Sequence, residues 1–169
     1  MFWIKTFILF LIFLASLKAG KVISKKYANR VIELKEMKNA LNTFLTKIKF
    51  TYESVPESFS EIGNNIHGKV GEIFKNASNN MKEMPAGEAW KKAIEENETS
   101  FNSEDKNIIE NLGRMLGKVD LEGQVSEIKL VQNFLDTQID LAEKEKQKNE
   151  KLYKTLGGII GLAIVIILV

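Results

Sequence analysis

Cysteine is absent from this chain of 169 residues, and histidine occurs once. Without cysteine, the protein has no disulfide framework and no thiolate chemistry. The single histidine, His67, argues against a metal site built from imidazole groups, because such sites combine several histidines or cysteines. The sequence also offers no nucleophile paired with a general base. We therefore predict that the protein is not an enzyme and that it holds no metal and no cofactor.

Residues that interrupt helices are scarce as well. Proline occurs only at Pro56 and Pro85, and the chain has 11 glycines. Apolar residues recur at the spacing of a helix, and no segment alternates as a half-buried strand does. The predicted fold class is therefore all-α, an antiparallel bundle of about six helices between an N-terminal and a C-terminal membrane helix.

Two long apolar runs predict the membrane helices. Residues 152–169 carry one charge, at Lys154, and at about 1.5 Å per residue they span most of a hydrocarbon core of roughly 30 Å. A buried C-terminal helix is the alternative, but the run has no polar face. Residues 1–20 are similarly apolar; they read as an uncleaved anchor, with a cleaved signal peptide as the alternative. Basic residues beside both runs place the domain between them, residues 21–151, in the cytoplasm.

Charge is distributed unevenly along that domain. Residues 20–55 carry eight basic and three acidic side chains, whereas residues 56–142 carry nine basic and sixteen acidic ones. Binding to nucleic acid requires clustered lysine and arginine, so the acidic middle of the chain argues against a nucleic-acid partner.

The pattern of apolar residues, caps and breakers divides the domain into helices. An amphipathic helix over residues 22–52 has a stripe of coiled-coil type, whose expected partner is the long last helix or another molecule. Ser54 is the expected cap of the next helix, with Glu57 at the capping-box position. The remaining predictions are helices over residues 70–84 and 89–94, then a helix with an apolar face from Ile108 to Val119, an N-terminal cap at Ser103 and a C-terminal cap at Gly117, and finally a last helix capped by Asp120.

Two glycine patterns allow more than one interpretation. Residues 63–69 match most of a phosphate-binding loop, but Val70 replaces the required hydroxyl and no strand precedes the loop, so we interpret the match as chance. Gly157, Gly158 and Gly161 form a patch of small residues inside the C-terminal apolar run, where another membrane helix could approach closely.

Short motifs follow one another in an order typical of one protein family. They are Glu88-Ala89-Trp90, Leu112-Gly113, Leu116-Gly117 with Asp120 and Gln124, residues 151–157, and the closing run 161–168. In this order the chain resembles the stage III sporulation protein AB family of endospore-forming bacteria over essentially its whole length. The resemblance implies structural roles for Trp90, Leu112, Gly113, Leu116, Gly117, Asp120 and Gln124, and no catalytic residue.

The resemblance also implies a role and partners. It implies an integral membrane protein of the mother-cell membrane around the forespore, with a soluble domain similar to the cytoplasmic domain of the type II secretion platform protein. The implied function is a platform in the mother cell–forespore channel that couples a secretion-type ATPase, stage III sporulation protein AA, to other stage III sporulation membrane proteins. Membrane lipids are further partners, and a homo-oligomer is left open.

The acidic middle of the chain suggests where such an ATPase binds. Our hypothesis is that a group of glutamates meets a basic surface on the ATPase, the alternative being ordinary solvated carboxylates. The group consists of Glu83, Glu88, Glu95, Glu96 and Glu98. The alternative function is a membrane-tethered helical sensor or regulator whose domain lies outside the cytoplasm, which would follow if the first apolar run were a cleaved signal.

Overall fold

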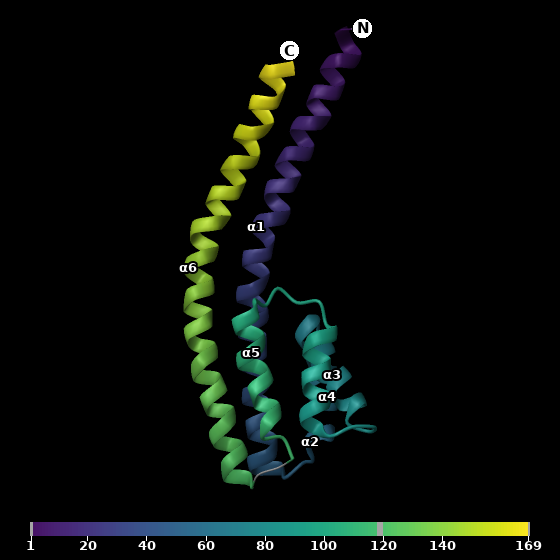
Figure 1. Ribbon diagram of the computed structural model, residues 1–169, viewed down its shortest axis with the longest axis vertical. Helices are drawn as coiled ribbons and strands as arrows, with labels where there is room; N and C mark the ends of the chain where they lie inside the picture. Colours follow the sequence, from purple (N-terminus) through teal and green to yellow (C-terminus); the bar gives the residue numbers. More distant parts are fainter. Residues whose placement is uncertain (1, 118–119, 169) are drawn as a thin grey trace. The chain divides into compact units, whose positions relative to one another are not determined.

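Every regular element of the described chain is a helix. The computed structural model describes residues 2–117 and 120–168, apart from the side chains of residues 2–6, 8, 17, 154 and 168. The elements are α1 (Phe2–Thr46), the π-helical turn η1 (Lys47–Thr51), α2 (Val55–Asn65), α3 (Lys69–Asn80), α4 (Ala86–Glu96), α5 (Ser103–Asn111), the 3₁₀ turn η2 (Leu112–Arg114) and α6 (Leu121–Leu168). The prediction of an all-α fold of about six helices is confirmed (Figure 1).

Contacts divide the chain into two compact units. The first unit combines Met1–Val31 with Leu141–Val169, and the second spans Ile32–Asp140. The first unit therefore contains the beginning of α1 and the end of α6, whereas the second contains the other parts of these helices and every helix between them. The predicted domain, residues 21–151, includes the whole second unit.

In the first unit, α1 and α6 run antiparallel with their backbones in contact (Figure 1). A Cβ added at Gly20 would lie 2.6 Å from the carbonyl oxygen of Tyr153, and one added at Gly157 would lie 3.1 Å from that of Ser16. The Ser16 hydroxyl donates a hydrogen bond of 2.8 Å to the Gly157 carbonyl. Small residues on both helices thus permit an approach that larger side chains would prevent.

The two predicted membrane helices are not found in the described part of the chain. Where the side chains are described, none of the helices combines the length and the apolar character needed to cross a membrane. Both predicted spans, residues 1–20 and 152–169, reach residues outside the described ranges.

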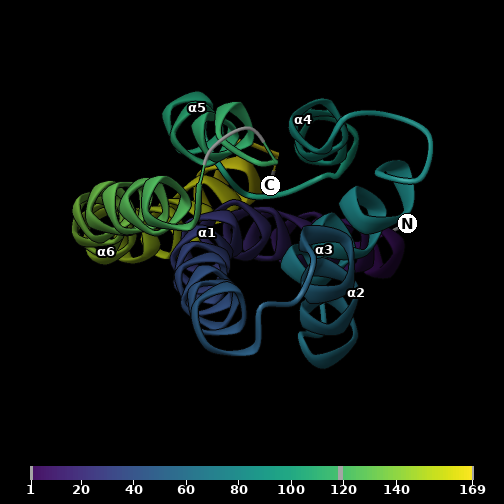
Figure 2. The same cartoon turned by 90° about the horizontal axis from the view of Figure 1, so that it is seen from below.

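The core of the second unit is built around four aromatic rings. Phe44, Phe59, Phe74 and Trp90 come from α1, α2, α3 and α4, and all four are fully buried. The rings meet edge to face, with centroid separations between 4.8 and 5.2 Å, which is a favoured arrangement of aromatic pairs. Figure 2, which looks along the long helices, shows α2, α3 and α4 grouped beside α1, with α6 on the opposite side.

Two of the predicted helix caps are confirmed, at the starts of α2 and α6. The carboxylate of Glu57 accepts hydrogen bonds from the backbone N–H of Ser54 (3.3 Å) and from its hydroxyl (2.8 Å), at the start of α2. Asp120 accepts a 3.0 Å bond from the backbone N–H of Gly123 at the start of α6. In both places a side chain satisfies a donor that the helix itself leaves unpaired.

Other helix ends differ from the prediction. Asn102, and not Ser103, caps α5, because Asn102 and Asp105 bond each other's backbone N–H groups at 2.7 and 2.9 Å. The helix predicted to reach Val119 ends at Asn111, and Val119 lies outside the described residues. Helix α3 ends at Asn80 and continues as a turn up to Met84, before Pro85.

The glycines of the phosphate-loop-like segment have a packing role. Gly63 is a buried residue within α2, and a Cβ there would lie 2.8 Å from the backbone nitrogen of Lys75 on α3. A Cβ at Gly71 would overlap the Ile66 carbonyl oxygen. His67 is exposed between the two helices. The segment is a tight crossing of α2 and α3, which agrees with the interpretation of the motif as chance.

Candidate functional site

The proposed partner-binding glutamates all lie on exposed positions of the second unit. Glu88, Glu95 and Glu96 belong to α4, Glu83 lies in the turn before it, and Glu98 lies in the connection to α5. All five side chains are exposed, and therefore available to a partner.

Ion pairs on α4 are weak. Lys91 pairs with Glu95 at 3.7 Å and Lys92 pairs with Glu96 at 3.9 Å. Exposed pairs of this kind typically contribute only about 0.3–0.5 kcal/mol. A partner's cation could therefore replace either lysine at little cost.

A groove of about 440 Å³ adjoins the exposed face of α4. Its wall on the α4 side includes Pro85, Glu88 and Lys91, and its opposite wall includes Glu110 and Arg114. Both carboxylates and cations line it, so it suits a polar segment of a partner better than an isolated anion or cation. Of the five glutamates, Glu88 is the one that contributes to this groove.

Close backbone packing fixes the floor of this groove. A Cβ at Gly87 would overlap the carbonyl oxygen of Gly113, and one at Gly113 would lie 3.1 Å from Cδ1 of Trp90. The indole N–H of Trp90 donates a 2.8 Å hydrogen bond to the Ile109 carbonyl. If α5 continued, the Ile109 carbonyl would accept a hydrogen bond from the backbone N–H of Gly113. The indole N–H of Trp90 takes the place of that donor where α5 ends.

The remaining motif residues surround this junction. Leu112 and Leu116 are buried, and Gly117 has a φ of +72°, a left-handed conformation that favours glycine. Asp120 caps α6, and Gln124 lies beside Phe44 and Ile128. The motif residues thus occupy the packed connection between α4, α5 and α6.

The glycine patch of α6 faces α1. Gly157 and Gly161 are buried against Ser16 and Phe13, whereas Gly158 is half-buried. A Cβ at Gly161 would lie 3.2 Å from the Cβ of Ser16. These glycines therefore permit the close approach of α6 to α1 of the same chain.

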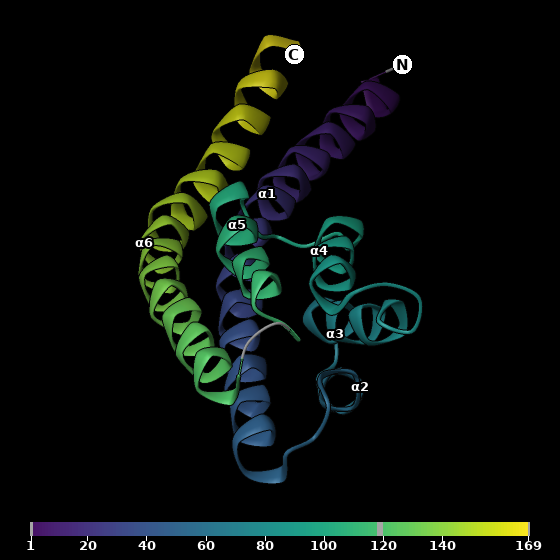
Figure 3. The same cartoon turned by 60° about the horizontal axis from the view of Figure 1, so that its bottom comes forward.

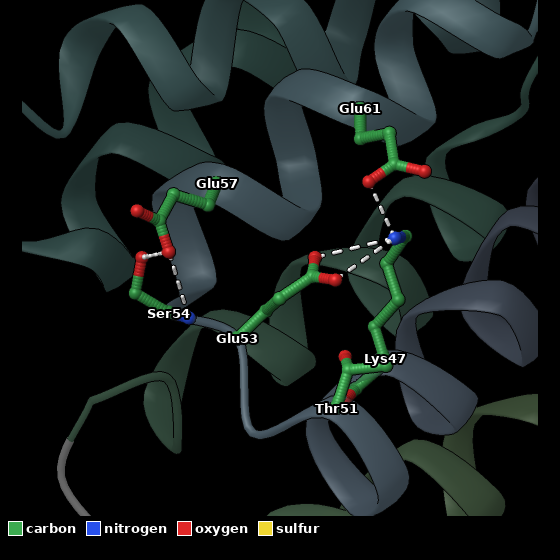
Figure 4. A network of polar contacts seen from close by, with 6 residues as sticks. All are labelled: Lys47, Thr51, Glu53, Ser54, Glu57 and Glu61. Atoms are coloured by element: carbon green, nitrogen blue, oxygen red, sulfur yellow. Dashed lines mark hydrogen bonds and ion pairs between the residues drawn. The ribbon is translucent and has the colours of Figure 1, made fainter.

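Sequence reasoning missed a polar network at the end of α1. The ammonium group of Lys47 contacts Glu53 at 3.2 Å and Glu61 at 2.5 Å, which connects η1 to α2 (Figure 4). The hydrogen bond to Glu61, with Glu53 as a further contribution, raises the pKa of Lys47. The hydrogen bond from Lys47 lowers the pKa of Glu53. Separations of six and fourteen residues are not helical neighbours, so spacing alone gave no signal for these pairs.

Comparison with known proteins identifies the family. A family model described as stage III sporulation protein AB matches residues 5–169. The chain belongs to this family. A relative in the stage III sporulation protein AB family, the protein of that name from Bacillus subtilis (strain 168), is 24% identical over 161 residues, which cover 93% of this chain and 94% of the relative.

A solved structure supports the fold of this family member. The structure titled stage III sporulation protein AB (SpoIIIAB) superposes with a TM-score of 0.66 at 18% identity, covering 71% of this chain and 98% of the other. At that identity the likeness speaks for the fold alone.

Proposed function

We propose that this member of the stage III sporulation protein AB family is a non-enzymatic membrane platform. It forms part of the channel between mother cell and forespore and couples a secretion-type ATPase of the stage III sporulation protein AA type to the channel's membrane components. It resides in the mother-cell membrane around the forespore, with its second unit in the cytoplasm.

The apolar exterior of the first unit carries this proposal. Large apolar side chains there point away from the helix–helix contact and are exposed. They include Phe7, Phe10, Leu11, Ile159, Ile160, Leu162, Ile166 and Ile167. Exposed apolar surface of this extent is typical of a membrane or protein contact. A two-helix unit with small residues inside and large apolar residues outside suits lipid, because α-helices satisfy their own backbone hydrogen bonds there.

Basic residues beside the apolar segments favour the proposed orientation. Lys21, Lys25 and Lys26 follow the first segment, and Lys144, Lys146, Lys148 and Lys151 precede the second. Lysines near a membrane are retained on the cytoplasmic side, and each is worth roughly 1 kcal/mol close to anionic headgroups. The proposed partners are membrane lipids, the ATPase and other stage III sporulation membrane proteins.

Thiol labelling of a single-cysteine variant tests the orientation. Because the chain has no cysteine, Asn79→Cys provides one reporter on the exposed surface of α3. We expect a membrane-impermeant maleimide to modify it after lysis but not in intact sporulating cells. Modification in intact cells would favour the second candidate function, a tethered sensor or regulator with its domain outside the cytoplasm.

Charge reversal tests the ATPase contact. Glu95→Lys combined with Glu96→Lys should weaken the capture of purified ATPase roughly tenfold, and capture by the unmodified chain should fall as salt rises. Glu72→Lys is a suitable control, since Glu72 is also exposed and also has a helical lysine partner, Lys69 at 3.8 Å. Capture that responds neither to the reversal nor to salt would remove the glutamates from the proposal.

A further inference from the structure

A second groove lies where α1 ends and α6 begins. It has a volume of about 370 Å³ and is lined by Lys49, Leu121, Glu122, Val125, Ser126 and Lys129. Leu121 and Val125 are one helical turn apart and give it an apolar floor, while Lys49 and Lys129 are exposed on its rim. We call it the lysine-rimmed groove. It shares no residue with the groove beside α4.

Two exposed aromatic residues follow Lys49 closely in the chain. Phe50 is 67% exposed and Tyr52 is 79% exposed, more than the other large apolar side chains described in the second unit. The ammonium group of Lys49 lies 5.1 Å from the centre of the Phe50 ring, which connects this ring to the groove. Aromatic side chains are enriched among the residues that contribute most to protein–protein binding.

The backbone that carries these aromatic residues is strained and firmly held. Tyr52 has a φ of +54°, in the left-handed region that costs a non-glycine residue about 1 kcal/mol or more. The Thr51 hydroxyl donates a 2.7 Å bond to the Lys47 carbonyl, and Lys47 in turn holds Glu53 and Glu61 (Figure 4). The turn between α1 and α2 is visible in Figure 3. Because these bonds fix the turn before any partner arrives, little ordering is needed on docking.

The charges around the lysine-rimmed groove define its occupant. Lys49 and Lys129 favour carboxylates placed on both sides of an apolar segment. The lining includes two cations, Lys49 and Lys129, against one carboxylate, Glu122, so its net charge is positive. An anionic bilayer fits less well, because a concave site is filled better by a side chain than by a lipid surface. We propose that the lysine-rimmed groove docks an amphipathic helix of a partner protein, whose apolar residues enter between Leu121 and Val125 and whose acidic residues face Lys49 and Lys129.

This docking mode is independent of the proposed ATPase contact. The glutamates of α4 call for a basic partner surface, whereas the lysine-rimmed groove calls for an acidic amphipathic helix, a known mode of peptide recognition. A platform with two such sites of opposite chemistry can hold two different partners together.

Synthetic peptides test the proposal directly. The probe is a fluorescein-labelled helical peptide with leucines at i, i+3, i+4 and i+7 and glutamates on both flanks, and its counterpart carries lysines in place of the glutamates. With the full chain in neutral detergent micelles, we expect fluorescence anisotropy to show binding of the glutamate peptide and at least tenfold weaker binding of the lysine peptide.

Variants locate the binding to the groove. Lys49→Glu with Lys129→Glu should weaken the glutamate peptide about tenfold and strengthen the lysine peptide, and Phe50→Ala should weaken both. Lys69→Glu with Lys82→Glu, at exposed positions that line neither groove, is the matched control and should change neither. If the double variant lost helical circular dichroism, Lys129→Glu alone would provide the same test.

Three outcomes would overturn the proposal. These are absence of binding by the glutamate peptide, equal binding of both peptides, and binding that the groove variants do not change. In one further experiment, the chain is held in phosphatidylcholine nanodiscs and mixed with phosphatidylglycerol vesicles. If it sedimented with the vesicles in a manner that required Lys49 and Lys129, but bound neither peptide, the surface would be assigned to a membrane instead.

Discussion

The two units differ in where their large apolar side chains lie, inside the second unit and on the surface of the first. In the second unit Phe44, Phe59, Phe74 and Trp90 pack together inside and the glutamates face outward. In the first unit glycine and serine occupy the contact between helices, and isoleucines such as Ile166 and Ile167 are exposed. Burial of apolar surface therefore accounts for the stability of the second unit, whereas the first relies on close packing of backbones.

Glycine nevertheless has the same role in both units, because it lets two backbone segments approach each other closely. Gly20 and Gly157 bring α1 and α6 together, and Gly87 and Gly113 bring α4 and η2 together. In the second unit, a fully buried aromatic ring fills the space beside the contact, since Trp90 touches Gly113. Removing the large residue should therefore matter most in the second unit, and adding a methyl group should matter in both.

The largest expected effect is that of Trp90→Ala. Truncating a fully buried tryptophan typically costs about 3–5 kcal/mol, much of the stability of an ordinary domain. We expect thermal unfolding of the full chain in detergent, followed by circular dichroism, to lose its main transition or to shift it strongly downward. Trp90→Phe should cost less, about 1–3 kcal/mol, because it removes the bond to the Ile109 carbonyl but keeps most of the volume. An unchanged melting temperature for Trp90→Ala would contradict the burial of this residue.

A smaller effect is expected from a methyl group at the glycine contacts. Gly87→Ala introduces a Cβ against the Gly113 carbonyl and should destabilise the second unit by about 1–3 kcal/mol, as overpacking usually does. Gly20→Ala, against the Tyr153 carbonyl at 2.6 Å, should instead separate α1 from α6 and leave the unfolding of the second unit unchanged.

A disulfide reports on that separation. Ser16→Cys with Gly161→Cys should form an intramolecular disulfide, since the Cβ atoms would be close to disulfide range, and Gly20→Ala should lower its yield. Ser16→Cys with Ile160→Cys is the control and should not crosslink, because Ile160 is exposed. Equal yields with and without Gly20→Ala would mean that the helices do not depend on this contact.

The sequence predicted those features that depend on local pattern. The helical class and the caps at Ser54 and Asp120 follow from spacing and side-chain chemistry within one or two turns. The α5 cap was assigned to Ser103, one residue too late, although Asp105 stands three residues after Asn102 and completes a capping box with it. That error could have been avoided from the sequence.

Features that depend on contacts between distant residues could not be predicted in the same way. The apolar face from Ile108 onward predicted a helix to Val119, but Trp90 takes the Ile109 carbonyl and Gly113 packs on Gly87 where α5 ends. Likewise, the approach of Ser16 to Gly157 joins residues 141 positions apart. Of the candidate site, the sequence supplied the exposed glutamates; both grooves depend on tertiary packing.

The smallest expected effect concerns pH and is confined to the second unit. Lys47 lowers the pKa of Glu53 in the folded state, so the contribution of this carboxylate is present above its unfolded value of about 4.3 and is lost as pH falls through the folded pKa. Lys47 has a raised pKa, so its contribution is present below about pH 10.4 and is lost only as pH rises through the folded value.

Glu53→Gln should therefore melt slightly lower than the unmodified chain at pH 7, and the difference should shrink as the pH falls below about 4. Glu98→Gln, at an exposed position, is the control for loss of a carboxylate. The disulfide between positions 16 and 161 should not respond to the same change in pH. A melting difference that stayed constant from pH 7 to pH 3 would show that Glu53 acts by packing and not by its charge.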